Sequence, residues 1–236
     1  MTAVALIPAA GSSRRMGFDK ILHELDGVPL LVRTLRRLQE AMVFTDFIVA
    51  VQPGMEQDIL AQFLEPNGLA GSVRVVAGGA TRTHSVWHAL ETVRNEPDLV
   101  AVHDAARPFV SADAVRASLD AAREFGGAIV ATRVIPTIKV ADERDCVEAT
   151  PGRTRLWAAA TPQSFRYRDF LAAYRRFWAS GDDPASLTDD AQIFERAGGT
   201  VKLVEGNSDN IKITTSLDWR IAELLCSPSP LFTTHH

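Results

Sequence analysis

Short apolar runs alternate with longer amphipathic segments over the first half of the chain, and this alternation restricts the possible folds more than any other feature. The apolar runs, each predicted to be a strand, are Val4–Pro8, Phe47–Val51, Val73–Ala77, Leu99–His103 and Ala128–Thr132. The amphipathic segments, each predicted to be a helix, are Pro29–Gln39, Glu56–Leu64, Thr81–Arg94 and Ala112–Phe125. Strands that alternate with helices form parallel βαβ units. We therefore predict an α/β fold with a mostly parallel, twisted sheet and helices on both of its faces.

The alternation breaks over Arg133–Arg155. Within this segment Val134–Ala141 alternates loosely, Asp142–Asp145 is a charged turn, and Cys146–Thr150 is typical of a returning strand. The pattern predicts a β-hairpin with too few large apolar residues to form a core of its own. Because an isolated hairpin is only marginally stable in water, this arm must pack on its own sheet or on another subunit.

The remaining third of the chain returns to mixed elements. We expect helices at Tyr167–Trp178, Asp189–Ala197 and Ser216–Leu225, and strands at Thr200–Val204 and Asn210–Thr214. A chain of 236 residues fits one α/β domain. We therefore expect a single domain over 1–226 with the arm 133–155 inserted, followed by a flexible tail, 227–236, that is rich in proline, serine and threonine.

The composition argues against several classes of protein. The net charge is −4, whereas a protein that binds nucleic acid over a broad surface is usually strongly basic. No stretch reaches the ~20 consecutive apolar residues that span a bilayer. The two cysteines, Cys146 and Cys226, and the histidines have neither metal-ligand nor redox spacing. We expect a cytoplasmic protein with no nucleic-acid or membrane partner.

Ligands bind beyond the carboxyl ends of the strands in open parallel sheets, so the residues that follow each strand are the candidates for chemistry. The first strand leads into Ala9–Lys20, where small residues let backbone N–H groups approach phosphate oxygens. Arg14, Arg15 and Lys20 against Asp19 leave two positive charges on this loop, which suits a triphosphate. An exposed loop with solvated arginines would have the same composition, and the loop has neither P-loop nor dinucleotide-binding spacing.

Three further segments each allow two interpretations. Asp104 follows an apolar run and could hold Mg²⁺ together with phosphate oxygens, or could cap a turn beside an Arg107 that forms a surface ion pair. Lys212 lies between two apolar residues; it could protect an edge strand from aggregation or, if it faces Asp104, could be a phosphate donor. The Gly78–Ser85 turn could cap the next helix through a threonine, or could contact a nucleotide.

Five motifs occur in an order that resembles the methylerythritol-phosphate cytidylyltransferases. They lie in Ala9–Lys20, Val102–Pro108, Leu156–Gln163, Thr188–Ala191 and Asn210–Thr214. The HDAARP segment within the second is the most specific, and five motifs in register are hard to obtain by chance. The resemblance extends from near the first residue to about Leu225.

The resemblance implies a Rossmann-like nucleotidyltransferase fold, a homodimer formed through the 133–155 arm, and CTP and Mg²⁺ as ligands. The implied reaction transfers CMP from CTP to methylerythritol phosphate, which gives the diphosphocytidyl product and pyrophosphate in the non-mevalonate isoprenoid pathway. The implied catalytic residues are Arg15, Lys20 and Lys212 on the CTP phosphates, and Asp104 as the metal and substrate-side carboxylate. The implied nucleotide contacts are Ala10, Gly11, Gly79, Ser85 and Ala105. The implied sugar-phosphate contacts are Arg107, Thr137, Arg153, Thr161 and Thr188.

The chain departs from the family pattern in its first loop. Ser13 stands where a second glycine is usual, Asp19 where a proline precedes the lysine, and Ile21 where a glutamine follows it. The loop also has two residues fewer between Met16 and Lys20.

Two other functions fit parts of this pattern. A ribitol 5-phosphate cytidylyltransferase would share the loop and much of the HDAARP segment, but the Leu156-Trp157 approach to Thr161-Pro162-Gln163 favours methylerythritol phosphate. A non-catalytic nucleotide-binding protein on the same fold would not need Arg15, Asp104 and Lys212 together.

The arm leads to a prediction of its own. A hairpin that projects from the sheet cannot easily fold back to the CTP loop of its own subunit, but in a two-fold dimer it can cross to the partner. Thr137 and Arg153 match sugar-phosphate contacts, and arginine suits a phosphate because its planar fork binds phosphate bidentately. We therefore predict that Thr137 and Arg153 serve the active site of the neighbouring subunit.

Overall fold

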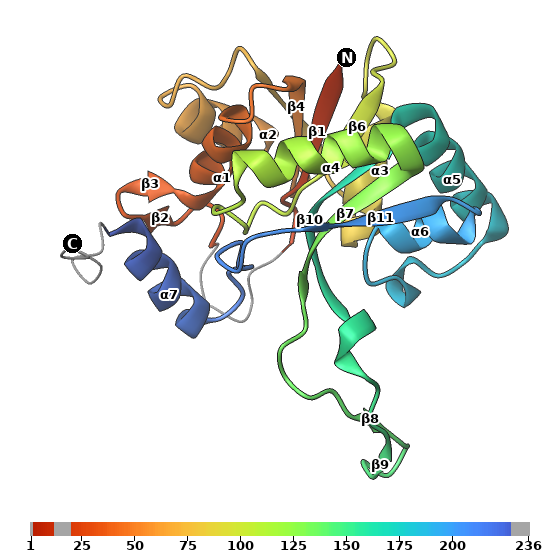
Figure 1. Ribbon diagram of the computed structural model, residues 1–236. Helices are drawn as coiled ribbons and strands as arrows, with labels where there is room; N and C mark the ends of the chain where they lie inside the picture. The colour runs from red at the N-terminus through yellow and green to blue at the C-terminus, as the bar shows by residue number, and fades with distance from the viewer. Residues whose placement is uncertain (1, 12–19, 228–236) are drawn as a thin grey trace.

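A seven-stranded sheet runs through the centre of the computed structural model, which describes residues 2–11 and 20–227 (Figure 1). The strands are β1 (Ala3–Pro8), β4 (Phe44–Val51), β5 (Val73–Ala77), β6 (Leu99–Val102), β7 (Gly126–Arg133), β10 (Trp157–Arg166) and β11 (Thr200–Glu205). Their order across the sheet is β11-β7-β10-β6-β1-β4-β5. Neighbouring strands are parallel except at β10, which is antiparallel to both β6 and β7. The predicted mostly parallel sheet is confirmed.

Helices cover both faces of this sheet (Figure 1). They are α1 (Leu30–Gln39), α2 (Glu56–Ile59), which continues as a π-helical turn over Leu60–Leu64, α3 (Arg82–Glu91), α4 (Ala112–Phe125), α5 (Tyr167–Ser180), α6 (Ala191–Arg196) and α7 (Ser216–Cys226). Apolar side chains of α1, α2 and α4 pack on one face, together with alternate residues of β1 such as Ala5 and Ile7. Side chains of α3, α5 and α6 pack on the other face, together with Val4 and Leu6.

The local sequence explains where α3 and α4 begin. Thr81 caps α3, because its side chain accepts a hydrogen bond from the backbone N–H of His84, and Ser111 caps α4 in the same way. The predicted capping function of the Gly78–Ser85 turn is therefore confirmed. The apolar stripe of α1 is buried as predicted, with Leu31 and Leu35 both fully enclosed.

Two segments differ from the prediction. Trp157–Arg166 forms the inner strand β10. The sequence did not predict this strand, because small residues and Pro162 give the segment little strand pattern. The strand pairs with β7 on one side and β6 on the other, and residues 160–165 within it are buried. The predicted strand Asn210–Thr214 is wrong: this segment joins no sheet and instead lies against the loop after β6, where the Ile213 N–H donates to the Ala106 carbonyl (2.9 Å).

A small third cluster explains this placement. A short hairpin, β2 (Glu24–Leu25) and β3 (Val28–Pro29), faces α7, and the side chain of Ile213 is buried between them with Leu25 and Trp219. Burial of Ile213 turns its neighbour Lys212 toward the carboxyl ends of the strands, where the loop after β6 begins.

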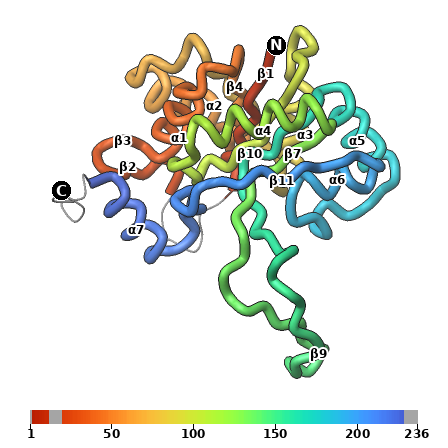
Figure 2. Tube along the Cα trace, viewed as in Figure 1, coloured from red at the N-terminus to blue at the C-terminus, as the bar shows by residue number. Residues whose placement is uncertain are grey.

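The arm leaves the sheet between β7 and β10 and projects away from the rest of the chain (Figures 1 and 2). Its strands are β8 (Val140–Ala141) and β9 (Val147–Ala149), which are antiparallel. A carboxylate oxygen of Asp142 accepts hydrogen bonds from the backbone N–H groups of Arg144 and Cys146 and so forms the charged turn. The predicted hairpin is confirmed, and it leaves large apolar side chains uncovered: Ile135 is 79% exposed and Val147 is 63% exposed.

Within residues 2–11 and 20–227, every helix is too short or too polar to cross a lipid bilayer. Only Ser227 of the predicted tail lies in the described part of the chain, so the expectation for 228–236 stays a prediction.

Candidate active site

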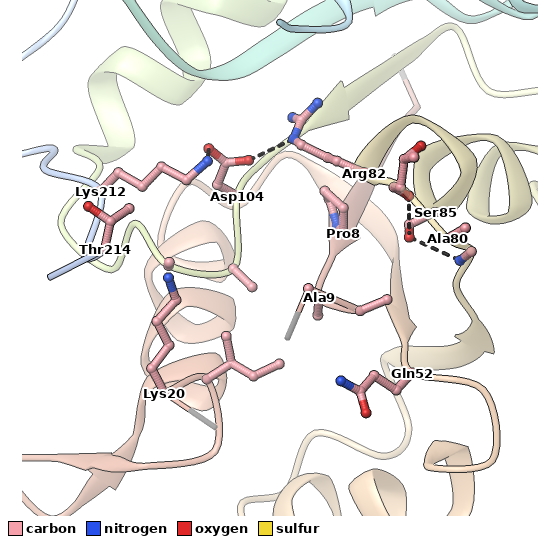
Figure 3. A pocket seen from close by; sticks show the side chains of 17 residues that line it. Pro8, Ala9, Lys20, Gln52, Ala80, Arg82, Ser85, Asp104, Lys212 and Thr214 are labelled. Carbon is pink, nitrogen blue, oxygen red and sulfur yellow. Dashed lines mark hydrogen bonds and ion pairs between the residues drawn. The ribbon is translucent and has the colours of Figure 1, made fainter. Parts of the chain in front are cut away.

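A cavity of about 610 Å³ opens at the carboxyl ends of β1, β4 and β6 (Figure 3). Its wall comes from the residues that follow β1, from Gln52 after β4, from the turn before α3, and from Asp104 to Ala106 after β6. Lys20, Lys212 and Thr214 close it on one side. This is the edge of the sheet where the alternation of strands and helices predicted the chemistry.

Most of the predicted catalytic and nucleotide-binding residues meet in this cavity. Those that line it are Lys20, Asp104, Lys212, Ala10, Gly11, Gly79, Ser85 and Ala105. Arg15 lies outside the described residues. The predicted sugar-phosphate contacts, Arg107, Thr137, Arg153, Thr161 and Thr188, are not part of the cavity wall, so their contacts with substrate stay predictions.

The wall beside α3 needs glycine. A Cβ atom on Gly78 would lie 2.5 Å from the Cβ of Ala10, and a Cβ atom on Gly79 would lie 2.3 Å from the Cβ of His84. The Ser85 hydroxyl donates to the Thr81 carbonyl (3.0 Å) and accepts from the Gly79 N–H (3.1 Å), which holds the turn in place. Backbone atoms therefore form this side of the cavity and can approach a flat ligand closely.

Asp104 is the centre of charge in the cavity. Its Oδ1 atom accepts a hydrogen bond from Nε of Arg82 (3.0 Å). Its Oδ2 atom pairs with Nζ of Lys212 (3.0 Å) and with Nε of Arg107 (3.3 Å). The structure thus decides between the two interpretations of Lys212: its ammonium group faces Asp104 rather than protecting an edge strand (Figure 3).

These cations keep Asp104 ionised. Burial by itself would raise the pKa of Asp104, but the charges of Arg82, Lys212 and Arg107 outweigh burial and hold the pKa well below its ordinary range. The carboxylate therefore remains negative at any pH at which the protein would work, and Lys212 keeps its partner. The described part of the cavity wall presents the positive charges of Lys20, Arg82 and Lys212 around the Asp104 carboxylate, which suits a polyphosphate.

His103, next to Asp104, is fully buried and organises the loop from behind. Its Nε2 atom donates to the Arg107 carbonyl (3.0 Å), because a carbonyl oxygen can only accept. The Thr161 hydroxyl donates to Nδ1 (3.0 Å) and accepts from the Asp104 backbone N–H (3.1 Å). Burial lowers the pKa of His103 to about 4, so the imidazole is neutral at pH 7. Each of its two ring nitrogens then has one hydrogen-bond partner.

This lowered pKa predicts a pH-dependent stability. Because the folded pKa lies below the ordinary value near 6.5, the unfolded chain binds the extra proton first, and the free energy of unfolding falls as the pH drops from 6.5 toward 4. We expect this group to account for about 2 kcal/mol between pH 7 and pH 5. Urea unfolding of the wild type and of His103→Gln, whose amide stays neutral, measures it. If both lose the same free energy of unfolding over this range, His103 is not the group responsible.

A second layer of polar side chains supports the site and was not assigned from the sequence. Arg82 donates through Nη1 to Oδ2 of Asp190 (2.6 Å), and the Tyr174 hydroxyl donates to Oδ1 of the same carboxylate (2.6 Å). Oε1 of Gln163 accepts from the backbone N–H groups of Asp190 and Ala191. The available signals were that Asp190 lies in the fourth motif and that Arg82 opens the helix after its cap.

The described residues permit one mode of metal binding. No cluster of three His, Cys, Asp or Glu side chains within the described ranges could enclose a metal ion. Asp104 is the one carboxylate among the described residues of the cavity wall, and Nε of Arg82 donates to its Oδ1 atom. Mg²⁺ needs only one or two carboxylates when phosphate oxygens and water supply its other ligands. The donor set of the described residues fits a Mg²⁺ ion that arrives with a triphosphate.

The family is shown by comparison with known sequences. The sequence profile of the family described as 2-C-methyl-D-erythritol 4-phosphate cytidylyltransferase matches residues 3–227. The chain belongs to this family. The predicted family and enzyme class are thereby confirmed, and the chain is a cytidylyltransferase of the isoprenoid pathway that acts on methylerythritol phosphate with CTP.

Relatives agree with this assignment over nearly the whole chain. The 2-C-methyl-D-erythritol 4-phosphate cytidylyltransferase of Symbiobacterium thermophilum is 41% identical over 222 residues, which cover 93% of this chain and 91% of that protein. The 4-diphosphocytidyl-2C-methyl-D-erythritol synthase structure from Anaerococcus prevotii is 32% identical, with a TM-score of 0.82 over 94% of this chain and 97% of that chain. The cytidylyltransferase structure from Thermus thermophilus is 33% identical, with a TM-score of 0.78 over 95% and 98% of the two chains. The predicted nucleotidyltransferase fold is confirmed.

Proposed function

We propose that the 610 Å³ cavity is where the chain transfers CMP from CTP to 2-C-methyl-D-erythritol 4-phosphate, with Asp104 and Lys212 at the reacting centre. The observation that supports this most directly is the pair itself: an ammonium group 3.0 Å from a buried carboxylate at the carboxyl end of a central strand. A protein that only binds a nucleotide needs a pocket. It does not need a fixed cation that a buried carboxylate holds at one end of that pocket.

The reaction requires cations more than it requires a base. A phosphate oxygen of the sugar phosphate attacks the α-phosphorus of CTP in line, a new P–O bond forms, and the bond to the β-phosphate oxygen breaks to release pyrophosphate. The attacking phosphate is already anionic, so no strong general base is needed. Negative charge develops on the α-phosphate oxygens and the leaving group, and fixed cations stabilise it. In this proposal Lys20 and Lys212, which line the cavity, provide two of these cations, and Arg15 is the further residue that the family pattern assigns.

The polarity of the cavity orients the nucleotide. Lys20 and Lys212 lie on one side of the cavity, and the uncharged wall of Ala80, Ser85 and Gln52 lies on the other (Figure 3). The triphosphate belongs at the cationic side, and the base belongs against the backbone of the Gly79–Ser85 turn. Backbone groups at fixed positions favour cytosine, since uracil presents an acceptor where cytosine presents its amino donor.

The role of Mg²⁺ belongs to this proposal. Asp104 would be its protein ligand, and the triphosphate and water would provide the others. Such an ion would neutralise phosphate charge as the leaving group departs. The chain's own contribution is to hold Asp104 ionised and oriented, through the Thr161 hydroxyl on its backbone N–H and the cations on its carboxylate.

The dimer and the shared site are also proposals. Arg153 donates through Nη1 to the carbonyl of Ile135 (2.8 Å), so its guanidinium bridges the two sides of the arm. The arm projects from the rest of the chain, as Figure 1 shows, and its exposed apolar side chains are available to a second copy. We place the enzyme in the cytoplasm, where two cysteines without a disulfide partner would remain reduced.

Release of pyrophosphate tests the proposed function. The purified chain with CTP, Mg²⁺ and 2-C-methyl-D-erythritol 4-phosphate should release pyrophosphate, and UTP should react at least about tenfold more slowly at equal concentration. A chelator should stop the reaction. Competition between methylerythritol phosphate and ribitol 5-phosphate identifies the acceptor. Preference for the ribitol ester would mean that the family assignment does not extend to the substrate, and no release with either acceptor would contradict the proposal.

A further inference from the structure

Arg82 joins the cavity to a carboxylate buried behind it. Its Nε atom donates to Oδ1 of Asp104 at the cavity wall (3.0 Å), and its Nη1 atom donates to Oδ2 of Asp190 (2.6 Å). One planar guanidinium therefore spans two carboxylates with two different edges. Arginine can do this because its donors are fixed in a rigid fork, whereas a lysine ammonium is a single point of charge.

Asp190 has hydrogen-bond partners at both carboxylate oxygens and at its backbone N–H. It is 1% exposed, the Tyr174 hydroxyl donates to its Oδ1 atom (2.6 Å), and the Gln163 side chain accepts from its backbone N–H (3.1 Å). These partners come from α5 and β10, far along the chain from Arg82 on α3. Burial, with Asp190 beside it, raises the pKa of Tyr174 well above its ordinary value, so the hydroxyl stays protonated and donates. Neither Tyr174 nor Asp190 lines the cavity.

The contact with Arg82 determines which oxygen of Asp104 is left for Lys212. Arg82 occupies Oδ1, and Lys212 and Arg107 share Oδ2. Without Arg82, the Asp104 carboxylate could rotate about its Cβ–Cγ bond. Lys212 could then pair with either oxygen, and its ammonium group would occupy more than one position. Displacement of a reacting or stabilising group by about 1 Å can cost on the order of 10² in rate.

We propose that Arg82 and Asp190 are positioning residues for the transfer: Asp190 fixes Arg82, and Arg82 fixes Asp104 with its second oxygen turned to Lys212. This inference rests on the proposed function of the cavity and adds to it two residues that act through Asp104. Arg82 lines the cavity, but two carboxylates take its Nε and Nη1 donors, and in this proposal it acts on the transfer through them.

A double-mutant cycle tests the order of this chain of contacts. Arg82→Gln and Asp190→Asn should each lower kcat by roughly 10- to 100-fold and change the dissociation constant of CTP by less than about threefold. In the Arg82→Gln background, Asp190→Asn should lower kcat by no more than about a further twofold, because its effect passes through Arg82. Multiplicative losses would overturn the proposal, and so would a weakening of CTP binding in proportion to the loss of kcat.

Two further variants separate positioning from folding. Arg74→Gln removes another partly buried Arg–Asp contact, in which Arg74 Nε donates to Asp46 (2.9 Å) on the sheet away from the cavity. It should lower stability with no effect on kcat. Tyr174→Phe removes only the hydroxyl that orients Asp190, and should lower kcat by roughly 3- to 10-fold even if Asp190→Asn does not fold. Unchanged kcat in folded Tyr174→Phe and Arg82→Gln would contradict the proposal, whereas an inactive wild type would instead contradict the proposed function.

Discussion

Replacement of Lys212 by alanine should lower turnover by on the order of 10²–10³, the loss typical for removal of one donor that stabilises developing charge. The ammonium group lies 3.0 Å from Oδ2 of Asp104, at the end of the cavity where the phosphates belong. Because its attraction for phosphate increases as charge develops in the transition state, the loss should appear mainly in kcat. The dissociation constant of CTP, measured by calorimetry with Mg²⁺ present, should rise by less than about tenfold.

Lys202 provides the matched control for this prediction. It is a lysine on β11, its ammonium lies 5.1 Å from the centre of the Phe125 ring, and it is not part of the cavity wall. Lys202→Ala should leave both kcat and CTP binding unchanged. If Lys212→Ala behaves as Lys202→Ala does, or loses CTP binding and turnover equally, Lys212 has no special role in the transition state.

A mixture of two inactive variants should recover part of the enzymatic activity. Arg153→Ala removes a residue of the arm, and Lys212→Ala removes one of the cavity. If the arm serves the neighbouring subunit, one site of a mixed dimer carries both lesions and the other carries neither. Random exchange makes about half of the dimers mixed, each with one intact site, so about a quarter of the wild-type activity should return. Pyrophosphate release after subunit exchange measures it.

The control for this experiment mixes Lys212→Ala with Asp104→Asn. Both residues belong to the cavity of the same subunit, where they form an ion pair. Each site of that mixed dimer then carries one lesion, and no activity should return. Recovery in this control would show that the activity has another origin. Absence of recovery with Arg153→Ala, once exchange is demonstrated, would place the arm beside its own cavity.

Much of the fold follows from local pattern alone. Segments such as Val73–Ala77 and Ala112–Phe125 have the predicted bounds, because their apolar periods agree with the faces that they bury. The arm was predicted from the interruption of this period. The family resemblance also named several of the described residues that line the cavity, such as Asp104 and Lys212, because the loops after parallel strands come together at one edge of the sheet.

The remaining features depend on contacts between distant segments. β10 is a strand because β6 and β7 flank it, and its small residues and proline carry little strand signal of their own. Residues 210–214 have the alternation of a strand, yet the burial of Ile213 beside Trp219 holds them outside the sheet. A local sequence pattern does not indicate which distant segment will pack against it.

The sequence by itself determined the class of fold, the position of the cavity along the chain, and three charged residues that line it, Lys20, Asp104 and Lys212, but not Arg82. The tertiary structure alone decided how those charges are paired. Asp104 is joined to Lys212 and Arg82 across 108 and 22 positions of chain, and Asp190 to Arg82 across another 108. The physical reason is that a buried carboxylate is stable only beside cations, and which cations reach it depends on how helices and loops from distant parts of the chain pack on the sheet.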